Sequence, residues 1–262
     1  MGRNDQKNNK SFTIITPSYN QGKYIEQTIK SVVSQGKKED IEYLILDGGS
    51  SDNSLAVIER YSTRYPNIIK WRSKKDRGQV SAINEGLAKA KGDIVAYINS
   101  DDYYLDGTLS YIKHYFSSHP EKEWVIGDCK VDKKELAWTF SFKRNWPFQL
   151  HPLPLLLLNP INQPAVFLKR TFVKKVGKFN TKYKFAFDYD YWLRCTKISL
   201  PGRTQKKLAL FRVHKESAGS TKFAKQFKED LDVAKSHTNN KIIIFLHTIF
   251  SAIIIKLYQR MK

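Results

Sequence analysis

Four short apolar segments alternate with helical patterns in the first 110 residues, and this alternation is the strongest constraint on the fold. The apolar segments, rich in β-branched residues, span 11–16, 42–46, 68–71 and 94–98. Between them, apolar residues recur three and four positions apart, which is the period of a helix with one buried face. Repeated strand–helix alternation predicts an α/β fold with a mostly parallel central sheet flanked by helices.

Polar clusters follow three of these expected strands directly. They occupy 16–20, 47–52 and 99–102. Ligands of open parallel sheets bind outside the carboxyl ends of the strands, so we expect the three clusters to share one site. The last cluster, Asn-Ser-Asp-Asp, places two carboxylates at the mouth of a buried strand, where a cation would offset their repulsion. Such oxygen-rich groups suit Mg²⁺ or Mn²⁺ bridging to a nucleotide's phosphates, although an Asp-rich turn without metal is the alternative.

The charge of the chain indicates an anionic partner. Forty-five Lys and Arg residues against 25 Asp and Glu give a formal net charge of +20. Nucleic acid, an anionic membrane surface and phosphorylated substrates all fit this charge. The sequence has no zinc-finger spacing, RNP-like motif or helix-turn-helix signature, so nucleic acid is not the expected partner.

Cysteine content and the first residues indicate a cytoplasmic protein. The two cysteines, Cys129 and Cys195, do not form a disulfide framework of the secreted kind and fit a reducing compartment. Residues 1–10 are polar and basic, and no apolar stretch of a secretory signal follows them. We therefore expect a disordered basic lead-in and a cytoplasmic location.

Four motifs, in order, carry a resemblance to a known family. They are TPSYN, LDGGSSD, DRGQVSAINEGLAKAKGD and INSDD. In this order and spacing they resemble the nucleotide-sugar half of an inverting family 2 glycosyltransferase with the GT-A (Rossmann-like) fold. The resemblance implies a nucleotide-sugar-binding half at 11–110, an acceptor and catalytic half of the same domain at 111–225, and a C-terminal helical tail at 226–262.

The resemblance also implies roles for residues on the donor side. The residues expected against the base and ribose are Thr16, Pro17, Ser18 and Tyr19. Asp47 is expected to accept a hydrogen bond from the base, which for a uracil-like ring is its N–H edge. Arg77 is expected to approach the nucleotide or its diphosphate with a planar donor fork. The structural alternatives are that Asp47 only opens a Gly-Gly turn and that Arg77 pairs on the surface with Asp76 or Glu85.

The metal is expected at the end of the fourth strand. By the resemblance, Asp102 holds a divalent cation, Mn²⁺ or Mg²⁺, on the diphosphate, and Asp101 contacts ribose or metal. His214, in the motif FRVHKES, is expected to approach the metal–diphosphate, or to be structural; Arg212 and Lys215 are alternative phosphate contacts. Many relatives carry an acidic residue where this chain has Asn99, whose uncharged oxygen predicts weaker cation affinity.

The segment FAFDYDYWLR at 185–194 resembles the acidic motif that opens a helix in this family. Inverting transfer requires a carboxylate that takes the proton of the acceptor hydroxyl as its oxygen attacks the anomeric carbon. Asp188 matches the position of this base, and Asp190 is the second candidate, as a structural residue or acceptor ligand. Capping of a helix N-terminus is the alternative, because Asp is favoured there.

The apolar run at 242–255 is interrupted by His247, Thr248 and Ser251 and flanked by basic residues. It is shorter than the roughly 20 apolar residues that span a bilayer. An interfacial helix on an anionic membrane surface fits this pattern. A helix packed on its own domain or in a dimer contact is the alternative.

Together these features predict a metal-dependent glycosyltransferase that moves a sugar from a nucleoside-diphosphate sugar, such as a UDP-sugar, to an acceptor hydroxyl. The expected acceptor is a saccharide or lipid-linked saccharide in surface polysaccharide assembly, at the cytoplasmic face of a membrane. A catalytically degenerate relative that binds a nucleotide or polyanion is the main alternative. A nucleotidyltransferase would need a glycine- and lysine-rich loop that TPSYNQGK does not supply, and nucleic-acid binding through the basic surface is the fourth hypothesis.

Overall fold

The computed structural model describes residues 11–36, 40–132, 153–214 and 223–260. The expected basic lead-in at 1–10 and Lys215 lie outside the described residues. Within them, one eight-stranded sheet has the order β3-β2-β1-β4-β7-β6-β8-β5. The strands are β1 Phe12–Ser18, β2 Ile41–Asp47, β3 Ile69–Ser73, β4 Ile94–Tyr97, β5 Tyr103–Tyr104, β6 Trp124–Val131, β7 Val166–Lys169 and β8 Gly202–Phe211.

The first half of the sheet is parallel and the second half is mixed. Strands β1 to β4 pair in parallel, as the strand–helix alternation predicts. β7 runs antiparallel to both β4 and β6, whereas β8 pairs in parallel with β6 and antiparallel with β5. The fold class predicted from the sequence is therefore confirmed, with antiparallel pairs added by the second half.

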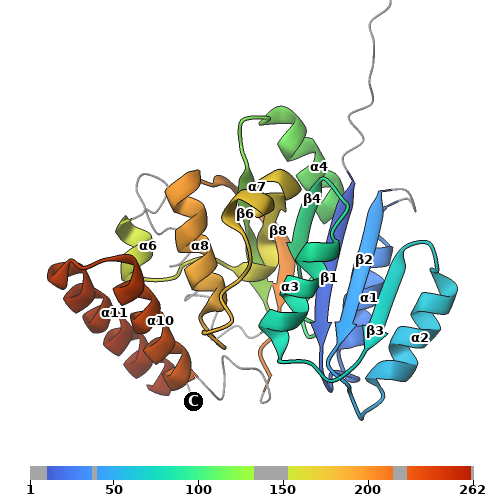
Figure 1. The fold of residues 1–262 in the computed structure, drawn as a ribbon, viewed down its shortest axis with the longest axis horizontal. Helices are drawn as coiled ribbons and strands as arrows, with labels where there is room; N and C mark the ends of the chain where they lie inside the picture. Colours follow the sequence, from blue (N-terminus) through green and yellow to red (C-terminus); the bar gives the residue numbers. More distant parts are fainter. Residues whose placement is uncertain (1–10, 37–39, 133–152, 215–222, 261–262) are drawn as a thin grey trace, which may run out of the picture.

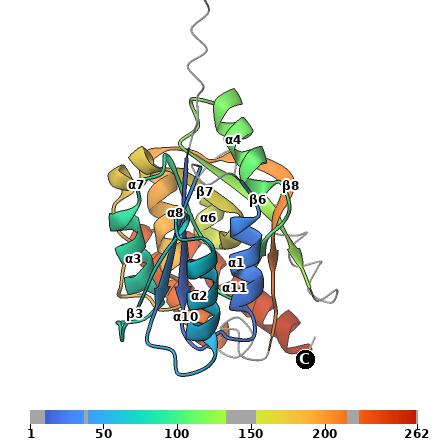
Figure 2. The ribbon, with the colours of Figure 1, turned by 90° about the vertical axis from the view of Figure 1, so that its right-hand side faces the viewer.

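Helices cover both faces of the sheet (Figure 1, Figure 2). The helices are α1 Ile25–Val33, α2 Ser54–Arg64, α3 Gln79–Lys89, α4 Thr108–Ser118, α6 Leu153–Leu157, α7 Arg170–Val176, α8 Phe187–Ile198, α10 Phe223–His237 and α11 Lys241–Arg260, with a 3₁₀ turn η2 at Gln163–Ala165. Successive residues of β1 point to opposite faces: Ile14 packs with α1, α2 and α4, and Ile15 packs with α3, α7 and α8. Burial on both faces explains why these strands are almost continuously apolar.

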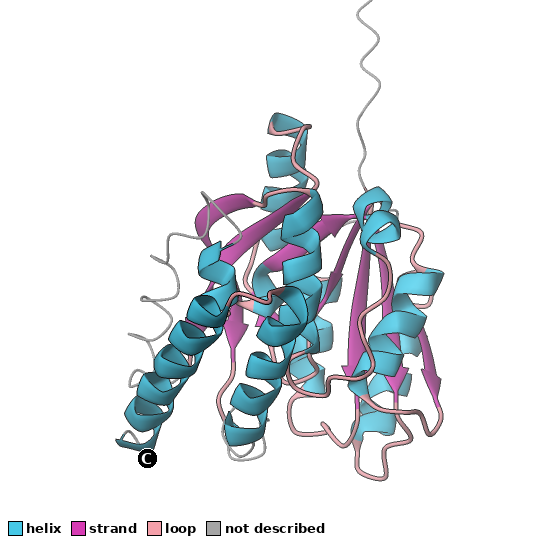
Figure 3. Cartoon of the chain, turned by 60° about the vertical axis from the view of Figure 1, so that its left-hand side comes forward, coloured by secondary structure: helices cyan, strands magenta, loops and turns pink. Residues whose placement is uncertain are grey.

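Strand register brings the predicted polar clusters to one edge. Ser18 at the end of β1 lies opposite Asp47 at the end of β2, and Asp47 lies opposite Ser73 at the end of β3. The backbone N–H of Ile98 donates to the carbonyl of Ile15, so the residues after β4 leave the sheet beside them. Figure 3 shows the loops that follow these strands gathered at the same end of the sheet.

The two C-terminal helices form an antiparallel pair at the side of the sheet where α8 lies (Figure 1). α10 ends at His237, and residues 238–240 connect it to α11, which begins at Lys241. α10 packs on α8, and α11 packs on α6 and α10. No helix in the described part of the chain is both long enough and apolar enough to cross a membrane.

Candidate active site

A cavity of about 710 Å³ opens at the edge of the sheet where the polar clusters meet. One wall comes from the residues that follow β1 and β4, and from the start of α3. The opposite wall comes from 159–164, from 184–188 at the start of α8, and from Gln226 of α10. The cavity thus lies between the parallel half of the sheet and the later part of the chain.

Three of the four residues predicted to face the base and ribose line this cavity. They are Pro17, Ser18 and Tyr19, and the Tyr19 side chain is 62% exposed. Thr16 does not line the cavity, because it is fully buried and its hydroxyl lies 3.0 Å from that of Tyr43. The structure therefore gives Thr16 a place in the core beside the site.

Asp47 is fully buried, and its carboxylate closes the loop after β2. Its Oδ1 accepts hydrogen bonds from the N–H groups of Gly49 and Ser50 at 3.0 and 2.8 Å, and from the Ser73 hydroxyl at 2.9 Å. Its Oδ2 accepts from the Ser50 hydroxyl at 2.6 Å. This geometry is that of the turn-opening alternative, and contact between Asp47 and a base stays a prediction.

Arg77 is exposed and is not among the residues that line the cavity. Its expected surface partners are held by Arg72 instead. Arg72 Nη2 lies 2.7 Å from Glu85 Oε2, and Arg72 Nη1 lies 3.2 Å from Asp76 Oδ2. Arg72 also donates to the carbonyl of Asp47, so it ties the loop after β2 to α3. A phosphate-binding role for Arg77 stays a prediction.

Asp101 and Asp102 both line the cavity. Asp102 is 1% exposed, and its Oδ1 accepts a hydrogen bond from the backbone N–H of Arg212 at 2.9 Å. Its Oδ2 is buried without a hydrogen-bond partner in the described part of the chain. Burial and the neighbouring charge of Asp101 raise the pKa of Asp102 well above its ordinary value. A bound cation would relieve both effects.

The aspartate pair fits a divalent cation shared with a diphosphate. Among the described residues, no group of three or more His, Cys, Asp or Glu side chains is arranged to hold a metal by itself. Mg²⁺ commonly takes one or two carboxylates and completes its shell with water and substrate phosphates. Asp102, with its unsatisfied oxygen, and Asp101 supply this kind of donor set.

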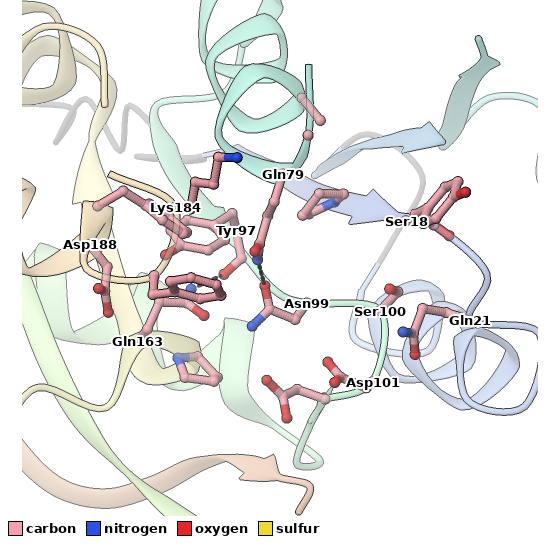
Figure 4. A pocket seen from close by; sticks show the side chains of 18 of the residues that line it. Ser18, Gln21, Gln79, Tyr97, Asn99, Ser100, Asp101, Gln163, Lys184 and Asp188 are labelled. Atoms are coloured by element: carbon pink, nitrogen blue, oxygen red, sulfur yellow. Dashed lines mark hydrogen bonds between the residues drawn. The ribbon is translucent and has the colours of Figure 1, made fainter. Parts of the chain in front are cut away.

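His214 and Asn99 already have partners near the aspartates. His214 Nε2 lies 3.0 Å from Asp101 Oδ2, and its ring lies 4.4 Å from that of Tyr24. The Asn99 Oδ1 accepts a hydrogen bond from Gln79 Nε2 at 2.7 Å (Figure 4). His214 therefore reaches the metal region through Asp101, and the oxygen of Asn99 is engaged by α3.

Asp188 lies in the first turn of α8 and lines the cavity. Its Oδ1 accepts a hydrogen bond from the backbone N–H of Tyr189 at 2.8 Å. Figure 4 shows Asp188 on the opposite side of the Gln79–Asn99 pair from Ser18 and Asp101. A substrate between the two walls would meet the aspartates after β4 on one side and Asp188 on the other.

Asp190, the second candidate, is held by partners on α8 and α10. It is 5% exposed and does not line the cavity. Its carboxylate accepts from Arg194 Nε and lies within hydrogen-bonding distance of His237 Nε2, both at 3.0 Å. Burial by itself would raise the pKa of Asp190. The hydrogen bond with His237 and the charge of Arg194 together outweigh this effect, so the pKa is lowered.

Glu229 of α10 is a site residue that the sequence did not reveal. Its Oε2 accepts hydrogen bonds from three consecutive backbone N–H groups, those of Lys184, Phe185 and Ala186, at 2.9, 2.7 and 3.0 Å. These residues lead directly into α8 and Asp188. The Glu229 carboxylate thus fixes the backbone that leads into α8, but it lies more than 40 residues further along the chain, so no local motif marks it. Lys184 and Gln226 line the cavity and carry no sequence signal.

The arrangement of sheet and helices is that of the GT-A glycosyltransferases, as the sequence predicts. A family model described as glycosyl transferase family 2 matches residues 13–189. The chain belongs to this family, and the predicted family is thereby confirmed.

The chain is similar to a relative and to solved structures of this class. It is 31% identical to the minor teichoic acid biosynthesis protein GgaB of Bacillus subtilis, over 93% of this chain and 29% of that protein. Residues 1–349 of S. aureus TarS, in complex with UDP-GlcNAc, share the fold with a TM-score of 0.65 at 19% identity, covering 85% of this chain and 66% of that one. The mannosyltransferase PcManGT from Pyrobaculum calidifontis, in complex with GDP-Man and Mn²⁺, gives 0.72 at 16% identity, covering 96% and 74%. The chain thus spans less than a third of GgaB and just under two thirds of the TarS fragment.

Proposed function

We propose that the protein transfers a sugar from a nucleoside-diphosphate sugar to an acceptor hydroxyl with inversion at the anomeric carbon. The observation that carries this proposal is the cavity, which has Asp101 and Asp102 on one wall and Asp188 on the other. Family membership supports glycosyl transfer, and structures of the same fold hold UDP-GlcNAc and GDP-Man. The donor would lie along Pro17, Ser18 and Tyr19 with its diphosphate toward Asp102.

The proposed chemistry is a single displacement. The acceptor oxygen forms a bond to the anomeric carbon, the bond from that carbon to the diphosphate oxygen breaks, and the Asp188 carboxylate takes the acceptor proton. Asp102 and Asp101 would hold Mn²⁺ or Mg²⁺, which when bound supplies positive charge for the departing nucleoside diphosphate. No covalent intermediate forms, which agrees with the burial of both Cys129 and Cys195.

The two untested donor contacts are part of the proposal. Arg77 lies on the exposed loop that leads into α3, next to Asp76 and Gly78, which line the cavity. From this loop its guanidinium would turn toward the diphosphate when a donor binds. Asp47 is fully buried and does not line the cavity, so we propose that it acts chiefly by fixing the loop at Gly48, which does.

We propose that the acceptor is a saccharide or lipid-linked saccharide of a cell-surface polymer. This rests on the similarity to GgaB, which is named for minor teichoic acid biosynthesis. The net charge of +20 fits phosphate-rich substrates and peripheral location at the cytoplasmic face of an anionic membrane.

Calorimetric titration with a panel of nucleoside diphosphates and their sugars tests the donor site. We expect one nucleotide to bind in the presence of Mn²⁺. Its affinity should fall about ten-fold or more in Asp102→Ala, because this variant lacks the carboxylate that would hold the cation. Asp106→Ala is the matched control, since Asp106 is exposed just four positions away. Absence of nucleotide binding in any metal would reject the proposal.

The same titration, combined with an assay of sugar transfer, distinguishes an active transferase from a catalytically degenerate relative. Nucleotide binding without any sugar transfer to a panel of acceptors or to water would favour a binding protein. Binding of polyanions that survives Asp102→Ala and falls steeply with salt would favour a polyanion-binding surface.

A further inference from the structure

The last helix, α11, has two polar side chains, those of His247 and Ser251, turned inward and a row of apolar side chains turned outward. His247 and Ser251 are 1% and 8% exposed. The exposed side chains on the other side are Ile242, Phe245, Leu246, Ile249 and Ile253, with exposures of 70%, 64%, 37%, 39% and 49%. These five residues recur at helical spacing along one face, which we call the outer face of α11. A helix whose outer side meets only water shows the opposite pattern.

Contacts on the inner side fix this orientation. His247 Nδ1 donates to the carbonyl of Leu156 at 2.8 Å, and its ring stacks on Tyr189 of α8 at 6.3 Å. Tyr189 in turn donates its hydroxyl hydrogen to the carbonyl of Leu155 at 2.7 Å. Burial lowers the pKa of His247, so the ring stays neutral near pH 7. Turning the outer face inward would break the hydrogen bond of His247 within a buried region.

The charges around the outer face select its partner. α11 contains no acidic residue, and the exposed Lys241 and Lys256 flank its apolar residues. An anionic lipid surface offers both an apolar boundary for Phe245 and Ile249 and phosphates for the lysines. A second copy of the chain would bring like charges together, since each copy carries a formal charge of +20. We propose that the outer face of α11 binds the surface of a membrane that contains anionic lipids.

This contact would place the cavity near the membrane. α11 runs back along α10, and Figure 1 shows its C-terminal end at the same end of the molecule as the carboxyl end of β1. α10 contributes Gln226 to the cavity, and α8 contributes Asp188. The wall that carries Asp188 is therefore the one joined to α10 and α11. A lipid-linked acceptor would approach from this side, a consequence that rests on the proposed transferase function.

Flotation of the full chain with vesicles tests the surface. Vesicles of phosphatidylcholine alone are compared with vesicles that also contain phosphatidylglycerol, at low and high salt. We expect binding to the anionic vesicles that weakens with salt and falls about ten-fold or more in Phe245→Asp, because a charge replaces an inserted ring. Ile198→Asp is the matched control, since Ile198 is 52% exposed at the end of α8, away from this face, and should bind like the parent chain.

The alternative outcomes overturn the inference. Absence of vesicle binding by the parent chain, equal loss in both variants, or a dimer in light scattering that Phe245→Asp converts to monomer would each assign the outer face to something other than lipid. Calorimetric binding of nucleotide is measured on the same samples. If the parent chain binds vesicles but no nucleotide, the donor site is rejected and the lipid-binding surface is retained. If it binds nucleotide but no vesicles, only the lipid-binding surface is rejected.

Discussion

Asp190 and His237 join α8 to α10 across 47 positions of sequence, with 3.0 Å between Oδ1 and Nε2. Both side chains are only 7% exposed, and Arg194 holds the other carboxylate oxygen. The start of α8 is held to the same helix by Glu229. α10 therefore supports the first turn of α8, which carries Asp188, through two separate contacts, and this support can be tested residue by residue.

Replacement of His237 by alanine should destabilise the fold. It leaves a buried carboxylate with one of its two partners missing, which costs about 1–3 kcal/mol in the free energy of unfolding. Urea unfolding followed by circular dichroism measures this. His114→Ala, at an exposed position of α4, is the control and should change stability by less than about 0.5 kcal/mol. Equal stability of His237→Ala and the parent chain would show that the contact contributes nothing.

Glu229→Ala should slow sugar transfer without weakening donor binding. Three N–H groups before α8 lose their acceptor, and a small displacement of Asp188 is expected to lower kcat by about 10- to 100-fold. Glu229→Gln keeps an oxygen acceptor and should recover most of the rate, which a general loss of folding would not explain. Glu121→Ala removes an exposed glutamate and is the control. Full activity in Glu229→Ala would exclude a positioning role.

Asp188→Asn should abolish the proton acceptor while preserving the shape of the site. The amide oxygen can still accept from the N–H of Tyr189. We expect kcat for transfer to fall by about 10²–10⁴ while the calorimetric affinity for the donor is unchanged. Asp232→Asn, at an exposed position of α10, is the control. A transfer rate near that of the parent chain would assign the base to another residue.

Glu85 provides a prediction on pH. The hydrogen bond from Arg72 lowers its pKa to about 2, against the opposing effect of burial. Because this value lies below the unfolded pKa of about 4.3, Glu85 stabilises the fold above about pH 4.3 and loses this contribution as the pH falls toward 2. Glu85→Gln should cost about 0.5–1 kcal/mol at pH 7, and the difference from the parent chain should narrow at pH 3. Urea midpoints at both pH values measure it; a constant difference contradicts the assignment.

Gly92 occupies a position without room for a side chain. A Cβ there would lie 2.4 Å from the backbone carbon of Phe12 and the backbone nitrogen of Thr13. Gly92→Ala must therefore separate β1 from the start of β4, and we expect a loss of about 2–3 kcal/mol in the free energy of unfolding. At Gly36 the closest atom would be an Ile41 methyl at 3.4 Å. Gly36→Ala is thus the control. In thermal unfolding, Gly92→Ala should have a clearly lower midpoint temperature than Gly36→Ala.

Much of the donor side follows from local sequence. Apolar runs and helical periodicity place β1 to β4 and α1 to α3 within a few residues of the structure, because each element buries a face that its own sequence defines. Parallel pairing then requires Pro17, Ser18, Asp101 and Asp102 to meet at one edge. The parallel pairing of the strands is therefore the reason why Asp101 and Asp102 lie at the edge of the sheet, as the INSDD motif predicts.

Long-range contacts decided the rest. Arg72 of β3 holds Glu85 of α3, an acid expected for Arg77, and Glu229 of α10 holds the backbone that leads into α8, more than 40 residues away. Neither of these pairings leaves a periodic or local pattern. The final helix shows the same division: its sequence determines that 242–255 is apolar and helical, but only packing against α6, α8 and α10 turns His247 inward and Phe245 outward. A helix's composition sets how much apolar surface it has, whereas the partners of its polar groups select which side is buried.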